Sequence, residues 1–309
     1  MQKIIPFLWF DTEAIEAMNF YTSVFPNTEI HSVDTFDNSE ATAHVNGTID
    51  TFNNSGPDEK TTVQVISFNI CGLQVQGMNA GPYFKPNPSI SFFVKCATRE
   101  EVTGYYNKLI EGGSAMMELG KYDWSEHYGW VTDKYGFTWQ IMYQAGLENG
   151  PTITPSLLFT GVNFGKAEKA LNLYTSLFKN SSIDVCQKHP EGSEHAGKIL
   201  YSECTLDGSR LIIMEGPGAH DFVFNEGISL SVETADQAET DYFWNGLIAD
   251  DGEESQCGWL KDACGVSWQI TPKQLNDLQK IDTSGRVMHA MLGMKKIIVS
   301  EIEAAYNNK

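Results

Sequence analysis

One thirteen-residue phrase occurs twice in this chain, and the repetition limits the folds that it can adopt. GWVTDKYGFTWQI covers residues 129–141, and GWLKDACGVSWQI covers residues 258–270. Two other pairs match in the same order: FYTSVFPNTEI (20–30) with LYTSLFKNSSI (173–183), and ISFFVKCATREEVTGYYNKLI (90–110) with ISLSVETADQAETDYFWNGLI (228–248). The separation between the copies shrinks toward the C-terminus, so the second copy has lost loop residues. A period this long is not that of a solenoid and predicts one domain duplicated in tandem.

The boundary between the copies falls at residues 145–155, AGLENGPTITP, where glycine, asparagine and proline cluster as in a linker. We therefore expect a first domain at residues 1–146, a second at 152–275 and a C-terminal helical extension at 276–309. Within the first copy, apolar and alternating runs mix with helical patterns in the order strand, helix and three strands, and this order then repeats. Each copy is predicted to hold two βαβββ modules, an α+β fold whose strands curl around a cleft.

Helix starts are marked by side chains that can cap a free backbone N–H. Thr98 and Glu101 form a capping-box pattern, and Asp236 with Glu239 occupies the corresponding positions of the second copy. The extension carries an apolar stripe at helical spacing, which predicts a helix docked on its own domain. A methionine-rich stripe can also provide an adaptable binding surface. Ser300 with Glu303 is a further capping pattern, where the helix could restart. The stripe consists of Val287, Met291, Met294, Ile298 and Ile302.

The charge of the chain argues against two classes of partner. The formal net charge is −19, and a nucleic-acid binder needs a basic surface to neutralise phosphates. Anionic membranes are disfavoured for the same reason. The N-terminal residues lack the pattern of a signal peptide, and no apolar run is long enough to span a bilayer. We therefore expect a cytoplasmic protein that binds neither nucleic acid nor membranes.

Paired βαβββ modules resemble the vicinal oxygen chelate superfamily, which includes glyoxalase I, bleomycin-resistance proteins and ring-cleaving enzymes with the dihydroxybiphenyl dioxygenase fold. Four segments are similar to its PhnB-like branch, which carries the label 3-demethylubiquinone-9 3-methyltransferase. The resemblance covers nearly the whole chain and implies tandem chelate-type domains packed as an internal pseudo-dimer, with a homodimer of chains as a further option. The segments are PFLWFD…AMNFYTSVFPNTEI, MNAGPYFKPNPSISFFV, KYDWSEHYGWVTDKYGFTWQI and RVMHAMLGMKKI.

Metal-dependent relatives hold a divalent ion with four side chains, one from each of the first, fourth, fifth and eighth strands, and the ion acts as a Lewis acid. Divalent ions prefer histidine nitrogens and carboxylates to neutral amides. Proline, serine and glycine cannot fill these roles, so neither copy has a full ligand set and we expect no metal cofactor. The resemblance places Pro6, Asn79, Ser89 and Gln140 at these positions in the first copy, and Pro155, Glu215 or Met214, Gly227 and Gln269 in the second.

The repeated Trp-Gln pair suggests what replaces the metal. Successive side chains of a strand point to opposite faces, so if Trp139 packs under the helices, Gln140 projects into the cleft. An amide can both donate hydrogen bonds to a ligand and accept them. The same holds for Gln269. A structural glutamine bonded to its neighbours is the alternative, and the sequence leaves both open.

Other candidate side chains divide into pocket residues and structural ones. We expect Trp9, Tyr122 and Trp124 to contact a ligand, together with Gln140, Gln269, Asn79 and Ser89. The aromatic segment 122–130 could instead be a flap over the core. His189 and His195 lie in a Gly/Pro/Ser-rich loop, which favours a solvated loop over a metal site. Glu215 is the candidate for catalytic acid–base chemistry.

Three functions are compatible with these residues. The first is a module that binds a small organic ligand in its cleft without a metal. The second is a lyase, isomerase or dioxygenase of the same superfamily, which would use Glu215. The third is the methyltransferase of the family label, but the chain lacks the Gly-rich turn between strand and helix that usually binds S-adenosylmethionine. It also has no GxSxG, HExxH or P-loop motif. We therefore favour the binding module.

Overall fold

The computed structural model describes residues 2–37, 62–148 and 150–308. Within these ranges the chain forms four modules with the predicted order of one strand, one helix and three strands, so the α+β fold of paired βαβββ modules is confirmed. The first two modules are β1 (Ile4–Phe10), α1 (Ala14–Val24), β2 (Thr28–Asp37), β3 (Thr62–Ile70), β4 (Leu73–Asn79), and β5 (Ile90–Cys96), α2 (Arg99–Leu109), β6 (Ser114–Tyr122), β7 (Ser125–Thr132), β8 (Thr138–Tyr143).

The second copy repeats this order after a short linker. It also contains a 3-10 turn, η3 (Gly161–Asn163), and its strand β14 is only two residues long because the second copy lacks most of the β6–β7 hairpin. Its elements are β9 (Thr152–Phe159), α3 (Ala167–Leu177), β10 (Ser182–Lys188), β11 (Ile199–Leu206), β12 (Ser209–Glu215), and β13 (Ile228–Thr234), α4 (Gln237–Ile248), β14 (Glu253–Glu254), β15 (Trp259–Lys261), β16 (Ser267–Pro272).

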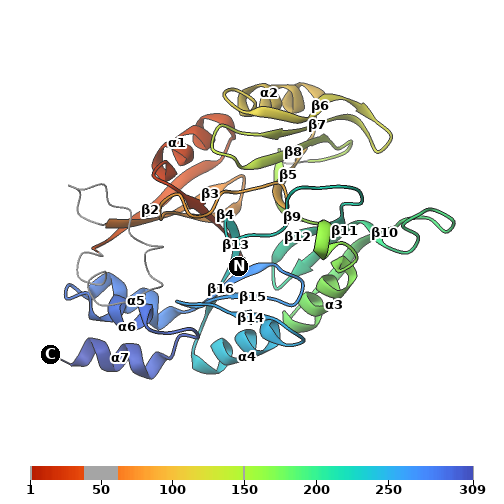
Figure 1. Ribbon diagram of the computed structural model, residues 1–309. Helices are drawn as coiled ribbons and strands as arrows, with labels where there is room; N and C mark the ends of the chain where they lie inside the picture. The colour runs from red at the N-terminus through yellow and green to blue at the C-terminus, as the bar shows by residue number, and fades with distance from the viewer. Residues whose placement is uncertain (1, 38–61, 149, 309) are drawn as a thin grey trace.

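The four modules combine into two eight-stranded sheets that each draw on both copies. Sheet A has the order β14-β15-β16-β13-β1-β4-β3-β2, and sheet B has the order β10-β11-β12-β9-β5-β8-β7-β6. Sheet A therefore joins the first and last modules, through the antiparallel pair β1–β13, and sheet B joins the two middle modules through β5–β9. Figure 1 shows the two sheets with the helices of all four modules around them. Neither copy builds a complete sheet alone.

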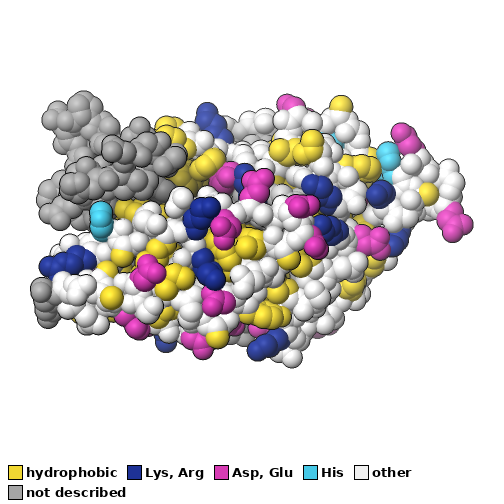
Figure 2. Space-filling view, turned by 60° about the horizontal axis from the view of Figure 1, so that its bottom comes forward, with side chains coloured by type: hydrophobic (Ala, Val, Ile, Leu, Met, Phe, Trp, Pro, Cys, Tyr) yellow, Lys and Arg dark blue, Asp and Glu magenta, His cyan; other side chains and the backbone are white. Residues whose placement is uncertain are grey.

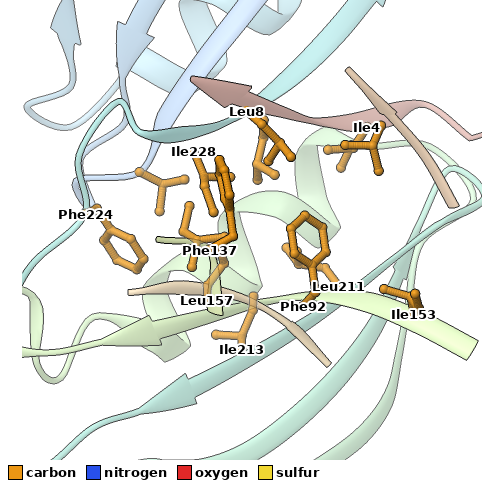
Figure 3. Packing of buried hydrophobic residues seen from close by; sticks show 14 of the residues in the cluster. Ile4, Leu8, Phe92, Phe137, Ile153, Leu157, Leu211, Ile213, Phe224 and Ile228 are labelled. Carbon is orange, nitrogen blue, oxygen red and sulfur yellow. The ribbon is translucent and has the colours of Figure 1, made fainter. Parts of the chain in front are cut away.

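The inner faces of the two sheets share one hydrophobic core with the helices. Leu8 and Ile228 point from sheet A toward Phe92 and Leu157 of sheet B (Figure 3). Trp139 lies in the same core, 1% exposed, with its ring centroid 5.1 Å from that of Tyr21 on α1. This confirms the prediction that the tryptophan of the repeated phrase packs under the helices. The opposite side of each sheet, called face A and face B below, points outward.

A buried aspartate explains why the phrase is repeated. Asp133 Oδ2 accepts hydrogen bonds from the Tyr21 hydroxyl and from Trp139 Nε1, each at 2.8 Å, while Oδ1 accepts the backbone N–H groups of Tyr135 and Phe137. The carboxylate therefore links helix α1 of the first module to the turn between β7 and β8 in sheet B. In the second copy the same bonds link Asp262 to the Tyr174 hydroxyl at 2.6 Å and to Trp268 Nε1 at 2.9 Å.

The C-terminal extension differs from the single helical stripe that its periodicity predicts. Three helices form instead, α5 (Lys273–Ile281), α6 (Arg286–Leu292) and α7 (Val299–Asn307), and the capping pattern of Ser300 and Glu303 does not start the last one, whose N-cap is Ile298. The helix is interrupted because the backbone carbonyls of Met294 and Lys295 accept the N–H groups of Cys257 and Gly258, each at 2.7 Å. The extension thus pairs with the strand edge that the shortened second copy leaves open (Figure 1).

Two sequence-level predictions of helix starts are confirmed. Thr98 accepts from the N–H of Glu101 and completes a capping box at α2, and Asp236 accepts from the N–H of Glu239 at α4. Figure 2 shows one side of the molecule, on which lysine and arginine side chains are scattered among aspartate and glutamate and form no basic patch. Within the described ranges, no helix is both long enough and apolar enough to cross a membrane.

Candidate functional site

Face A is hollowed by a cavity of about 740 Å³. Strands of both copies form its floor, where Phe7 and Met78 cluster with Trp259, and the Phe7 and Trp259 rings meet edge to face at 6.3 Å. Helices α5 and α6 of the extension form a further wall with apolar and thioether side chains. Polar and charged side chains line the rest of the cavity, among them Asp34, Glu233 and Lys3. The wall residues are Leu275, Met288, Met291 and Leu292, and the polar groups of the floor include Ser67, Gln76, Ser231 and Gln269.

Gln269 is held at this cavity by a neighbouring strand. Its Nε2 donates to Ser229 Oγ at 2.9 Å, across the parallel pair β13–β16. This bond fixes the amide with its carbonyl oxygen as the remaining hydrogen-bonding group. No described residue donates a hydrogen bond to Gln269 Oε1, and the residue lines the cavity. This oxygen can therefore accept a hydrogen bond from a ligand that enters the cavity.

Face B repeats the amide but closes the space around it. Gln140 Nε2 donates to Ser91 Oγ at 2.8 Å, and the Tyr128 hydroxyl donates to Gln140 Oε1 at 2.8 Å. Gln140 is buried, and the two bonds occupy both ends of its amide. The surrounding face is covered by a packed apolar cluster that contains Phe93, Tyr128 and Ile212, with Met117, Tyr122, Trp130, Met142, Tyr201 and Met214 against it. On this face the structural reading of the glutamine holds.

Side-chain size separates the two faces. The strand registers place Ser231 of face A where face B has Phe93, and Cys257 where face B has Tyr128. At most of these positions face A has the smaller side chain, and at Gln76 it has the polar one. The order reverses on β1, where face A has Phe7 and face B has Ser156. The cavity lies over the positions that are not filled. Further exchanges, face A first, are Val65 for Tyr201, Gln76 for Ile212 and Thr271 for Met142.

Asn79 and Glu215 occupy equivalent places outside both outer faces. Asn79 Oδ1 accepts the N–H of Ala14 at the start of α1 at 2.9 Å. Glu215 accepts the N–H of Gly165 at 2.7 Å and that of Ala167 at 2.9 Å, at the start of α3. Burial raises the pKa of Glu215, and the two backbone donors oppose that rise. Both side chains hold the first helix of their copy, and this placement separates Glu215 from the cavity, so no chemistry there is assigned to it.

The other predicted ligand residues are divided between the faces. Trp9 belongs to the floor cluster of face A, with its ring centroid 6.2 Å from that of Trp259, but it is 2% exposed and does not line the cavity. Its Nε1 donates to the Gly81 carbonyl at 2.8 Å. Ser89 precedes β5 on the sheet B side, and Ser91, two residues on, is the serine that Gln140 contacts. Tyr122 and Trp124 stack with ring centroids 5.0 Å apart over face B, where Trp124 is 60% exposed. The structure therefore brings only Gln269 of the predicted residues to the cavity wall.

Several residues around the two amides were not predicted from the sequence. Ser229 and Ser91 stand at matching places in ISLSV and ISFFV, so the internal alignment contained a signal for the serine partners of the glutamines. The same alignment shows Ser231 opposite Phe93. The internal alignment gave no signal for the wall that α6 supplies, because the extension occurs once. The methionine-rich stripe did suggest a binding surface, and its Met291 lines the cavity.

The donor set does not fit a divalent ion. In the part of the chain that the structure describes, no three His, Cys, Asp or Glu side chains come close enough to hold a metal. His189 and His195 lie with ring centroids 5.7 Å apart at the β10–β11 turn, away from both amides. Burial raises the pKa of the Cys257 thiol to about 12, so this cavity-lining sulfur stays protonated and is a poor metal ligand near neutral pH.

Comparisons with known proteins agree with this architecture. The chain matches the model of the family described as 3-demethylubiquinone-9 3-methyltransferase twice, over residues 2–142 and 151–271. A PhnB protein from Bacillus cereus is 33% identical over 46% of this chain and 100% of its own length, with a TM-score of 0.38. Glyoxalase I from Zea mays is 8% identical over 92% of this chain and 96% of its own, with a TM-score of 0.55, which shows a shared fold.

No curated protein matches the chain. The two family matches cover most of it and leave out the extension that closes the cavity. The chain therefore belongs to the 3-demethylubiquinone-9 3-methyltransferase, or PhnB-like, family and has the tandem vicinal oxygen chelate fold that its repeats predict.

Proposed function

We propose that the protein binds a small organic molecule in the cavity on face A, without a metal ion. The observation that carries the proposal is the contrast between two equivalent faces of one chain. Face B seals its glutamine with Tyr128 and fills the surrounding space with large side chains. Face A keeps the same amide and serine but leaves about 740 Å³ beside them. A recess on an outward face that combines apolar surface with a free amide acceptor is typical of small-molecule sites, and it supports a ligand.

The chemistry of the lining supports binding through amides and aromatic contacts. Phe7, Met78 and Trp259 offer apolar surface, and Gln269 offers one free acceptor. The metal-free part of the proposal rests on the donor set, because amides and serines bind divalent ions far more weakly than imidazoles and carboxylates. A lyase, isomerase or dioxygenase built on Glu215 is not favoured, since that carboxylate caps α3.

Native mass spectrometry of freshly purified full-length protein tests this proposal. We expect either a co-purified organic mass or, after addition of the neutral dye Nile red, one dye molecule per chain. Ser231→Phe places on face A the side chain that face B already has at Phe93, and it should abolish binding. Phe93→Leu changes face B alone and serves as the matched control, which should bind like the wild type. Dye binding unchanged in Ser231→Phe would contradict the proposed site.

The same spectra and an elemental analysis report on metals. Stoichiometric zinc, nickel, manganese or iron in the native protein would contradict the metal-free part of the proposal. Calorimetric titration with S-adenosylmethionine addresses the activity in the family description. We expect no heat of binding, since the motif usually found in such methyltransferases is missing from the sequence.

A further inference from the structure

Face B contains an occupant of the position that face A leaves open. Tyr128 presents a phenol, and its hydroxyl donates to Gln140 Oε1 at 2.8 Å while Gln140 Nε2 is held by Ser91 at 2.8 Å. Tyr128 and Gln140 are both buried. The protein thus shows, within its own fold, how this serine-anchored amide binds an aromatic hydroxyl group.

Face A has the same amide and serine but lacks the phenol. The Gly258 carbonyl accepts the N–H of Ile270 at 2.8 Å, as Gly129 pairs with Ile141 on face B, so Cys257 stands at the position of Tyr128. A cysteine side chain ends at Sγ, far short of where a tyrosine hydroxyl would lie. Cys257 lines the cavity, and no described donor reaches Gln269 Oε1. The space and the acceptor that a phenol would use are both present.

We propose that the cavity on face A accepts an uncharged aromatic ring that bears a hydroxyl group, and that this hydroxyl donates to Gln269 Oε1. The inference rests on the proposed function, that the cavity binds a small organic ligand, and it names the class of that ligand. The ligand ring takes the place that the Tyr128 ring has on face B. The protein supplies the acceptor and the ligand supplies the donor.

The lining of the cavity suits a neutral ring better than an anion. Trp259 and Phe7 present ring edges and faces, and Met288 and Met291 add thioethers, which make favourable contacts with aromatic rings. Four carboxylates line the cavity against three lysines, and Lys3 is already paired with one of these carboxylates at 2.9 Å. The carboxylates are those of Asp34, Asp207, Glu233 and Glu239, and the other lysines are Lys273 and Lys280. The chain carries a net charge of −19, which disfavours a phenolate. The protonated phenol is the form that both the acceptor and the charge select.

Calorimetric titration of the full-length protein with 2-naphthol and with naphthalene at pH 7 tests the proposal, because the two probes differ only in the hydroxyl group. We expect 2-naphthol to bind roughly three- to tenfold more tightly, which is the worth of one net hydrogen bond. Gln269→Leu should bring the two affinities together. Gln140→Leu is the matched change on face B and should leave the preference for 2-naphthol intact.

The outcomes separate this inference from the proposed function. If both probes bind the wild type equally and Ser231→Phe abolishes both, the cavity binds ligands but does not select a hydroxyl, and the inference is overturned. If neither probe binds the wild type, the inference fails, and Nile red binding decides whether the proposed function fails with it. A preference that survives in Gln269→Leu would also overturn the inference.

A second variant tests the recognition of a phenol where its geometry is visible. Tyr128→Ala removes the phenol from face B and leaves the amide and serine in place. The compound p-cresol is the tyrosine side chain as a free molecule, so we expect it to raise the unfolding temperature of this variant more than toluene does. The difference should disappear when Gln140→Leu is added. Equal effects of p-cresol and toluene on Tyr128→Ala would show that the amide does not select the hydroxyl and would overturn the inference.

Discussion

At the scale of single residues, one aspartate in each copy shows how strongly a repeated phrase can be constrained. Asp133 is buried, and its carboxylate accepts four hydrogen bonds. Burial raises its pKa to about 6, against the opposing effect of these donors. Burial raises the pKa of Asp262 as well, in the same setting. The aspartates, and not only the glutamines, are what the two phrases preserve.

The raised pKa of Asp133 predicts a dependence of stability on pH. The folded state holds this proton more tightly than the unfolded chain, so the contribution of Asp133 is fully present below pH 4 and is lost as the pH rises through 6. In Asp133→Asn, which cannot titrate, the free energy of unfolding should fall less between pH 4 and 6.5 than in the wild type, by on the order of 2 kcal/mol. Urea denaturation across this range measures the difference, and parallel curves would contradict it.

The same substitution should lower stability at pH 4, and the difference from the wild type should narrow as the pH rises to 6.5. Each oxygen of the Asp133 carboxylate accepts two hydrogen bonds. An asparagine has an NH2 group in place of one of these oxygens, and this group cannot accept, so at least one buried donor loses its acceptor. The expected cost is about 1–3 kcal/mol. Asp262→Asn is the matched variant in the second copy and should show a loss of the same size.

Local patterns predicted some of these residues and not others. The alternation of Trp139 and Gln140 across the strand was predicted and is confirmed, because it depends on neighbours in sequence. The partners of Gln140, namely Ser91 and Tyr128, come from other strands, so no local rule identifies them. Gln140 and Gln269 share a sequence context but have different surroundings, and only tertiary packing separates a sealed amide from an open one.

At the scale of elements, the first helix of each copy depends on a side chain from the end of the last strand in its module. Glu215→Ala removes both acceptors of the N–H groups before and at the start of α3. We expect a loss of about 1–2 kcal/mol in the free energy of unfolding, with Nile red binding unchanged. Asn79→Ala is the equivalent change at α1. A loss of binding without a loss of stability in Glu215→Ala would mean that this carboxylate acts at the cavity after all.

The extension shows where periodicity fails as a guide to an element. Its apolar stripe fits one helical face, yet residues 293–298 leave the helix because the open edge beside Gly258 offers two N–H groups to the carbonyls of Met294 and Lys295. A tertiary hydrogen bond here outweighs local helix propensity. Val287 and Ile302 of the stripe are buried in one small cluster, and Met291 and Met294 pack against it half-buried. Ile297 takes the buried place predicted for Ile298, so the stripe was right in part and its continuity was wrong.

At the scale of the whole molecule, each sheet needs both copies, and this predicts the behaviour of the separate halves. A chain divided at residues 148–150 and co-expressed as two pieces should assemble into one particle of full-length mass. The first half alone can pair its two modules only with those of another copy, so it should run as a homodimer. Analytical ultracentrifugation distinguishes these cases, and a folded monomeric half would contradict the cross-copy sheets.

The duplication and the module order were predictable from the sequence, and the fold was expected from the family that it resembles. The pairing of β1 with β13 was not, since these strands are more than two hundred residues apart and either pairing of modules buries the same apolar faces. The cavity followed from that pairing, because its floor combines Phe7 with Trp259 and its wall comes from the extension.

Two identical chains arranged around a twofold axis must present identical sites, because every mutation appears in both. Fusing the copies into one polypeptide removes this constraint, because a mutation then changes one face only. One face can then fill with large side chains and contribute only to stability, while the other keeps its cavity and can change its ligand independently. Tyr128 on face B and Cys257 on face A stand at equivalent positions and show how far the two faces differ.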